Sequence, residues 1–314
     1  MAFRFEVVLS NGKKKFTAIS NLSEAKIFCA RNERKWTRII LLLHGFPDNN
    51  TSFNEVVPII SNSFKEDNET LLLSPAMRGY EPSSQGKFDE YSSTDLANDV
   101  KAWLDSIDPG DIPIHLVGHD WGAIAAFKAA SLYPDLISSM VCLAIPYIHN
   151  IRIWELLWYV PEQIFLSSYM ITMQFASLYR PKLSQTDNSS YLDQLWSYWS
   201  PTWNYDRSDI ERVRKTLLGP GVIDAATAYY RCIASPLNFS GRRWEVDFEK
   251  VPTLLLGGEK DRCMSKKLYE LEIKKLHHNK KADVKILSNL GHFLHREDPL
   301  KVGELIADWF KKYS

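Results

Sequence analysis

The sequence predicts an α/β fold: a mostly parallel sheet flanked by helices, with a helical lid inserted into it. Short unbroken apolar runs recur along the chain, and stretches of helical character separate several of them. Runs that do not alternate are expected of strands buried on both faces, as in a parallel sheet covered by helices. The expected strands cover residues 39–43, 71–73, 114–117, 140–145, 253–256 and 284–287.

The segments around these strands fit the same fold. Residues 3–7 alternate between apolar and polar, Asn11-Gly12 favours a turn, and apolar residues resume at Phe16, which predicts a β-hairpin. Pro299 favours the start of a helix, because the first helical turn tolerates proline. Helices are expected over residues 93–107, 123–132 and 299–310.

A long aromatic-rich stretch without a comparable strand separates the fourth expected strand from the fifth. Structureless loops of that length are rare in compact domains, so we expect a mostly helical insertion. The predicted organisation is a first part of the α/β core over residues 1–146, a lid over residues 147–248 and a second part of the core over residues 249–314.

Composition limits the partners. The chain has 314 residues, of which 45% are hydrophobic, and its 38 basic residues balance its 38 acidic ones. A net charge of zero gives no indication of nucleic acid or an anionic membrane as a partner. No signal peptide and no run of about eighteen apolar residues is found, so we expect a cytoplasmic protein without a membrane span. The four cysteines lack metal-ligand or disulfide spacing and are expected to be reduced, with no metal or other cofactor.

The strongest functional motif is Gly-His-Asp-Trp-Gly at residues 118–122, between an expected strand and an expected helix. This context is typical of a nucleophile elbow, whose strained turn requires small flanking residues. Its central residue is Asp120, and a carboxylate there attacks an electrophilic sp3 carbon to form an ester. A simple capping role for Asp120 would leave the two glycines unexplained.

Residues 44–47, His-Gly-Phe-Pro, directly follow the first parallel strand. A turn there can direct the backbone N–H of Phe46 toward the elbow, and the N–H of Trp121 lies beside the nucleophile. The two donors are predicted to form an oxyanion hole. An ordinary turn at the end of a strand is the alternative.

His292 follows the last expected strand and is the candidate general base. Asp261 follows the preceding strand, and the chain order Asp120, Asp261, His292 is that of a nucleophile, an orienting acid and a base. Glu259 is the competing candidate for the acid. Three other histidines are expected not to take part in catalysis: His115, His119 and His295.

These motifs resemble those of epoxide hydrolases of the α/β-hydrolase superfamily, with an Asp nucleophile, and they span the chain from His44 to Pro299. The resemblance implies the α/β-hydrolase fold and the hydrolysis of epoxides to vicinal diols without a cofactor. The partners would be a small apolar epoxide and water. Asp120 would form the ester, and water activated by His292 and Asp261 would hydrolyse it.

The resemblance also implies that two lid tyrosines donate hydrogen bonds to the epoxide oxygen. The first matches Tyr169, and the second, which precedes Arg231, matches Tyr230, with Tyr229 as the competing candidate. Substrate contacts are thus expected from Phe46, Trp121, Tyr169 and Tyr230. The loop over residues 75–81 departs from the family, with Ala76 in place of Asp and Glu81 in place of Gly, and we expect this to affect the support of the loop.

Three other functions fit parts of the pattern. A haloalkane dehalogenase would use the same triad, but its second halide donor, an Asn, is replaced by Phe46. A fluoroacetate dehalogenase typically has Arg where this chain has Trp121. A binding protein that has lost its chemistry on the same fold is the third alternative.

Overall fold

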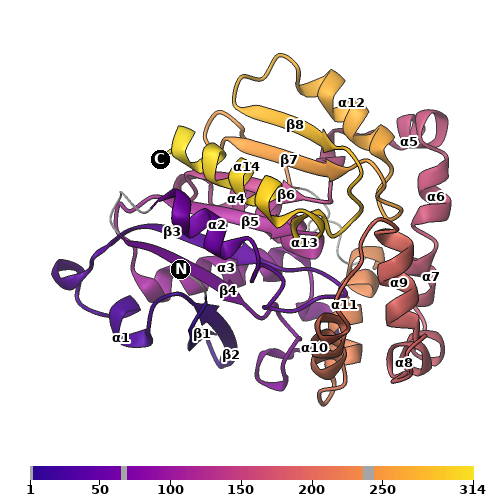
Figure 1. Ribbon diagram of the computed structural model, residues 1–314, viewed down its shortest axis with the longest axis horizontal. Coiled ribbons are helices and arrows are strands. Elements are labelled where there is room, and N and C mark those ends of the chain that lie inside the picture. Colours follow the sequence, from indigo (N-terminus) through magenta and orange to yellow (C-terminus); the bar gives the residue numbers. More distant parts are fainter. Residues whose placement is uncertain (1–2, 65–68, 236–243) are drawn as a thin grey trace.

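A single sheet of eight strands, in the order β1-β2-β4-β3-β5-β6-β7-β8, organises the computed structural model (Figure 1). The structure describes residues 3–64, 69–235 and 244–314. β1, β2 and β4 pair in antiparallel fashion, and all pairs from β4 to β8 are parallel. The predicted fold class and the amino-terminal hairpin are therefore confirmed. The strands are β1 (Phe5–Asn11), β2 (Lys14–Ser20), β3 (Trp36–Leu43), β4 (Glu69–Pro75), β5 (Ile114–His119), β6 (Ser139–Leu143), β7 (Thr253–Gly258) and β8 (Ala282–Leu287).

Burial on both faces explains why the strands read as unbroken apolar runs. In β3, Ile39 and Leu41 point into one hydrophobic cluster, while Ile40 and Leu42 point into the other. Helices cover each side, so no face of the central strands meets water. Helices α3 (Ser93–Ile107) and α4 (Trp121–Leu132) pack on the first cluster, and α2 (Val57–Ser63) and α14 (Pro299–Lys312) pack on the second.

Three sequence expectations need correction. The strand expected over residues 140–145 ends at Leu143, because Ala144 adopts a positive φ of 60° and turns the chain away. The helix expected from residue 123 begins at Trp121, directly after the nucleophile. β8 is only partly buried, since it lies at the edge of the sheet and pairs with β7 alone.

Helices occupy the described part of the chain between β6 and β7, and they lie together beside one end of the sheet (Figure 1). Residues 236–243 of the expected insertion lie outside the described residues, as do Met1 and Ala2. Within the described ranges, no helix is both long and apolar enough to cross a bilayer. The helices between these strands are α5 (Ile153–Tyr159), α6 (Glu162–Leu166), α7 (Tyr169–Thr172), α8 (Ala176–Leu183), α9 (Tyr191–Trp199), α10 (Arg207–Leu217) and α11 (Val222–Ala234); those outside them are α1 (Glu24–Ile27), α12 (Lys266–Leu276) and α13 (Leu294–Glu297).

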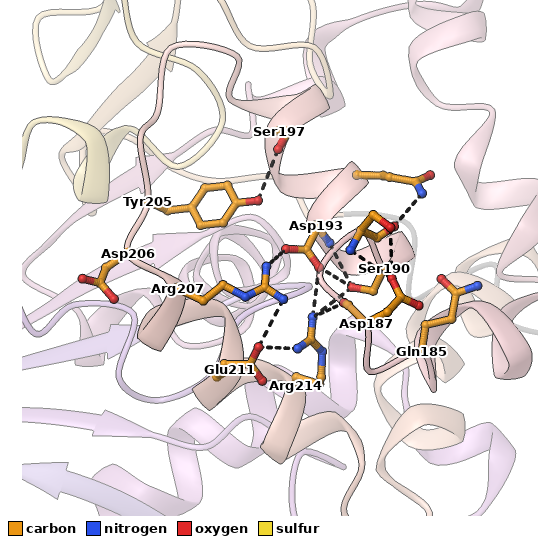
Figure 2. Close-up of polar contacts among 12 residues, drawn as sticks. Gln185, Asp187, Ser190, Asp193, Ser197, Tyr205, Asp206, Arg207, Glu211 and Arg214 are labelled. Carbon is orange, nitrogen blue, oxygen red and sulfur yellow. Dashed lines mark hydrogen bonds and ion pairs between the residues drawn. The ribbon is translucent and has the colours of Figure 1, made fainter.

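A buried ion-pair network joins α9 to α10 (Figure 2). Asp193 of α9 accepts hydrogen bonds from Arg207 and Arg214 of α10, the latter at 2.9 Å. Arg214 also donates to Ser190 at 3.0 Å and is only 3% exposed. Because an unpaired buried guanidinium would be strongly destabilising, this network favours one relative placement of the two helices.

Arg296 of α13 connects α10 to the loop after β3. Its guanidinium lies 2.8 Å from Asp209 of α10 and 3.6 Å from Asp48, which belongs to the loop after β3. Ser52 donates to Asp48 at 2.7 Å from the same loop. The loop that contains Phe46 is therefore tied to both the lid and the core.

Candidate active site

Asp120 lies in the sharp turn between β5 and α4. Its backbone adopts φ 51° and ψ −119°, a strained conformation for a residue with a side chain. A Cβ on Gly118 would lie 2.4 Å from the carbonyl oxygen of Gly122, and one on Gly122 would lie 2.0 Å from that of Leu43. Because three backbone segments approach one another closely here, neither Gly118 nor Gly122 can carry a side chain. This agrees with the predicted need for small residues on both sides of the nucleophile.

The loop after β3 contacts the carboxylate of Asp120 directly. The backbone N–H of Phe46 donates to Asp120 Oδ1 at 2.8 Å. Trp121 is the first residue of α4, so its N–H is among those that a helix leaves without an internal acceptor. Of the two donors predicted for an oxyanion hole, the N–H of Phe46 contacts the carboxylate and that of Trp121 directly follows Asp120 in the chain, a residue that is only 3% exposed.

Asp261 is the carboxylate that reaches His292. Its Oδ2 lies 3.0 Å from His292 Nδ1, and its Oδ1 accepts from the backbone N–H groups of Cys263 at 2.6 Å and Met264 at 3.0 Å. Glu259, the competing candidate, has a side chain that is 32% exposed and lies 3.8 Å from Lys266 at the surface. The geometry thus places Asp261 beside His292 and Glu259 away from it.

His292 Nε2 faces the nucleophile at 3.7 Å from Asp120 Oδ2. Burial disfavours the imidazolium, but the carboxylates of Asp261 and Asp120 outweigh that cost and raise the pKa of His292 to about 10. Among the described residues, Nε2 has no hydrogen-bond partner. This nitrogen therefore faces the carboxylate of Asp120 without a close contact to it.

Asp120 opens onto a cavity of about 360 Å³ between the core and the lid. Tyr169, Tyr230 and Trp121 line it together with aliphatic side chains from both sides. Such a wall suits an apolar molecule that is held by a few polar groups. The other described lining residues are Ile124, Ile145, Ile148, Ile151, Ile153, Leu156, Gln163, Ser167, Met170, Ile233, Met264 and Leu268.

The rings of Tyr169 and Tyr230 stand edge to face, with centroids 5.7 Å apart. The hydroxyl of Tyr169 lies 3.5 Å from Cys263 Sγ, and that of Tyr230 has no hydrogen-bond partner within the described ranges. Burial raises the pKa of both phenols well above the ordinary value. Both side chains therefore remain protonated, as hydrogen-bond donors must.

Tyr229 and Phe46, unlike Tyr230, are not among the described residues that line the cavity. Tyr229 donates its hydroxyl to the carbonyl oxygen of Arg78 and is not among the described residues that line the cavity. Phe46, for which a substrate contact was expected, does not line it either, and its ring packs edge to face on Tyr230 with centroids 5.5 Å apart. Phe46 thus contributes to the site in two ways: its backbone N–H contacts Asp120, and its ring packs against Tyr230.

The three remaining histidines of interest have partners inside the core. His119 Nε2 donates to the carbonyl oxygen of His292 at 3.0 Å, His115 Nδ1 lies 2.9 Å from Ser139 Oγ, and His295 Nε2 lies 2.8 Å from Ser52 Oγ. Burial lowers the pKa of all three. These contacts are those of neutral structural histidines.

Sequence reasoning missed the contacts between the lid and the loop that contains Asp261. Gln163 of α6 donates to the carbonyl oxygen of Cys263 at 2.9 Å and accepts from the N–H of Ser265 at 2.8 Å. A lone glutamine in a helix has no pattern that would identify such a role. Cys263 lies two residues after Asp261, but only the fold brings its thiol to Tyr169.

The loop with the unusual residues Ala76 and Glu81 is held away from the cavity. Glu81 accepts from the N–H of Thr17 at 2.6 Å, and Ala76 is buried in the core. Arg78 forms a buried pair with Asp99, with a distance of 2.7 Å from Nε to Oδ2. These contacts support the loop.

The chain is similar to known proteins over most of its length. Residues 38–299 match the family model described as alpha/beta hydrolase fold. The chain is 25% identical over 275 residues to the AB hydrolase superfamily protein YfhM of Bacillus subtilis, covering 87% of this chain and 90% of that protein. It is 28% identical over 279 residues to epoxide hydrolase 4 of Mus musculus, covering 87% of this chain and 73% of that protein. The solved structure of potato (Solanum tuberosum) epoxide hydrolase I has a similar fold, with a TM-score of 0.72 at 20% identity and coverage of 98% of this chain and 99% of that one. The resemblance that the motifs predicted is confirmed.

Proposed function

This chain belongs to the alpha/beta hydrolase fold family, and we propose that it hydrolyses apolar epoxides to vicinal diols through an ester on Asp120. One observation carries the proposal. The carboxylate of Asp120 and the phenols of Tyr169 and Tyr230 line the same cavity. In this arrangement the carboxylate can attack an electrophilic carbon, while the two phenols donate hydrogen bonds to the oxygen that leaves it. The apolar walls suit the rest of such a substrate. The printed names of several relatives, epoxide hydrolases 3 and 4 of Mus musculus among them, support the same reaction.

In the first step, Asp120 attacks one ring carbon and the bond from that carbon to the epoxide oxygen breaks. Tyr169 and Tyr230 donate hydrogen bonds to this oxygen as it gains charge, and one of them supplies the proton that makes it a hydroxyl. Charge-assisted hydrogen bonds of this kind stabilise the transition state more than the ground state. Tyr230 has no competing partner among the described residues.

In the second step, His292 takes a proton from a water that attacks the carboxyl carbon of the Asp120 ester. The N–H of Phe46 already contacts one carboxylate oxygen at 2.8 Å, and together with the N–H of Trp121 it would stabilise the tetrahedral oxyanion. Collapse of that intermediate releases the diol and restores the carboxylate, and the proton that His292 took from water passes through solvent to the phenol that protonated the epoxide oxygen. Asp261 keeps the imidazole oriented and stabilises its cation throughout.

Ester formation itself prepares His292 to act as a base. In the free protein the charges of Asp261 and Asp120 together raise the pKa of His292. The ester carries no charge, so the contribution from Asp120 disappears and the pKa of His292 falls below its value in the free protein, while Asp261 continues to raise it. The imidazole thus becomes a competent base at the point in the cycle where one is needed.

A halide-releasing reaction would use the same triad but is less well supported. The phenols match an oxygen leaving group that must be protonated, whereas a halide leaves without a proton. The aliphatic lining of the cavity would accept either apolar substrate. Turnover of an epoxide panel beside a haloalkane panel separates the two functions.

The ester is tested by a single turnover in water enriched in ¹⁸O, with protein in excess over epoxide. Because water attacks the carboxyl carbon, the label should enter the peptide that contains Asp120, and the first diol should carry an unlabelled oxygen from that carboxylate. Label in the first diol would mean that water opens the epoxide directly and would overturn the ester mechanism.

A further inference from the structure

The lid has an apolar outer surface as well as an apolar inner one. Seven large side chains on α5 and α6, which we call the outer lid face, are each more than half exposed. They are Ile153 (70%), Trp154 (52%), Leu157 (53%), Trp158 (81%), Tyr159 (52%), Ile164 (51%) and Phe165 (77%). Figure 1 shows both helices at the edge of the molecule, on the far side of the lid from the strands.

The aromatic side chains alone make the outer lid face as large as the largest apolar patch of a typical monomer, a patch that is often functional. An aromatic side chain has roughly 150–250 Å² of surface, so Trp154, Trp158 and Phe165 alone expose roughly 300–500 Å² at their observed fractions. The largest apolar patch on a typical monomer covers roughly 300–600 Å² in total. Three side chains thus reach that range before the aliphatic ones are counted, which indicates an interaction surface.

The outer lid face is continuous with the substrate cavity. Ile153 lines the cavity and is also 70% exposed, and Leu156 on the same helix lines the cavity wall. An apolar path therefore leads from the protein surface to the space in front of Asp120. A protein partner seated on this face would cover the end of that path, whereas a lipid phase would leave it open and would itself dissolve apolar molecules.

Basic residues border the outer lid face. Its two carboxylates, Glu155 and Glu162, each pair with a lysine of α12, at 2.5 Å to Lys275 and 3.0 Å to Lys267. On α12, Lys266 lies 3.8 Å from Glu259. Lys274 of α12 and Arg152 at the start of α5 are also exposed, against one exposed carboxylate on α12, Glu270. α12 lies beside α5 (Figure 1), and this border is complementary to anionic headgroups.

We propose that the outer lid face docks on a lipid surface containing anionic headgroups, with Trp158 and Phe165 inserted at the interface. Aromatic side chains on one face of a helix, with basic residues beside them, are typical of segments that lie in a membrane interface. The docked protein takes apolar molecules from the lipid phase through the path at Ile153. Docking itself does not depend on the reaction proposed above.

Flotation on a density gradient with lipid vesicles tests this docking. The full chain should rise with phosphatidylcholine vesicles, and a larger fraction should rise when phosphatidylserine is added. A double variant, Trp158→Ser with Phe165→Ser, should lose at least about tenfold in partitioning, because binding scales with the apolar area that is buried. Neither residue lines the cavity, and thermal unfolding checks that the variant is folded.

The matched control is Phe88→Ser with Leu300→Ser, two apolar residues that are 54% and 59% exposed outside the lid. This variant should float like the wild type. Failure of the wild type to float with either vesicle would overturn the proposal, as would flotation of the Trp158 and Phe165 variant at the wild-type level. A wild-type dimer that this variant dissociates, without flotation, would assign the face to a second copy of the chain.

Discussion

His292 Nδ1 lies 3.0 Å from Asp261 Oδ2, within a pocket that excludes both side chains from solvent. The opposite nitrogen lies 3.7 Å from Asp120 Oδ2, too far for a direct hydrogen bond. The imidazole is thus hydrogen-bonded to Asp261 through Nδ1, while Nε2 faces the nucleophile without a direct hydrogen bond to it. The two steps of the proposed reaction consequently depend on different residues, and they can be separated by mutation.

The variant His292→Gln should form the ester but fail to hydrolyse it. Alkylation needs Asp120 and the phenols, whereas hydrolysis needs a base that glutamine does not supply. Mass spectrometry after incubation with an epoxide should find the protein heavier by one substrate, with the added mass on the peptide that contains Asp120. The control is Asp120→Asn, freshly prepared and checked by mass, which should gain nothing. An unmodified His292→Gln protein would mean that His292 acts before or during alkylation.

Asp261→Asn should slow hydrolysis of the ester by about 10⁴-fold, the loss found when the orienting acid of a serine triad is replaced by its amide. The asparagine cannot stabilise the imidazolium that forms as water is deprotonated. Glu259→Gln is the matched control and should stay within about twofold of the wild type, because surface ion pairs contribute little. Stopped-flow decay of the ester measures both rates. Equal losses in the two variants would reopen the competition between these carboxylates.

Much of the site could be predicted because its motifs are local. The turn at Asp120 needs glycines that stand two residues before and after it in the sequence. The apolar runs indicate strands that are covered by helices on both faces. The contacts of Tyr229 and Tyr230 could not be predicted so well, since adjacent residues on a helix point in different directions and only tertiary packing decides which one faces the cavity. Gln163 and Cys263 were missed for the same reason. A net charge of zero also conceals how lysines are grouped on α12.

Glu272 should make the stability of the protein depend on pH. Its carboxyl group lies on α12 at 0% exposure, where burial outweighs the attraction of Lys275 and a contact with Asn150. Burial raises its pKa from 4.5 to about 8, so the folded state holds a proton that the unfolded state releases. The stabilising contribution is complete below pH 4.5 and is lost as the pH rises through about 8.

Glu272→Gln should remove this dependence, because the amide does not titrate. The melting temperature of the wild type relative to this variant should fall as the pH is raised through that window, as measured by calorimetry. Glu270→Gln, an exposed position on the same helix, should leave the wild-type dependence in place. Parallel curves for the wild type and Glu272→Gln would show that Glu272 is already ionised in the folded protein.

The last prediction concerns the lid phenols. Tyr169→Phe and Tyr230→Phe should each slow formation of the Asp120 ester without slowing its hydrolysis, because neither hydroxyl takes part in the attack of water. A hydrogen bond to a group that gains charge contributes roughly 1.5–3 kcal/mol, so each variant should lose about one to two orders of magnitude in alkylation rate. The double variant should lose more, although the two losses need not add.

Tyr229→Phe is the matched control, since the same substitution one residue away removes a hydroxyl that already donates to the carbonyl oxygen of Arg78. It should lower the melting temperature by leaving a buried acceptor unpaired, while alkylation keeps its rate. Tyr230→Phe should show the reverse, because its hydroxyl faces Trp121 and Tyr169 in the cavity and makes no hydrogen bond to a backbone carbonyl among the described residues. Single-turnover kinetics on one epoxide measure all three variants. Unchanged alkylation in both Tyr169→Phe and Tyr230→Phe would remove the phenols from the reaction, and with them the main structural reason to prefer an epoxide over a halide.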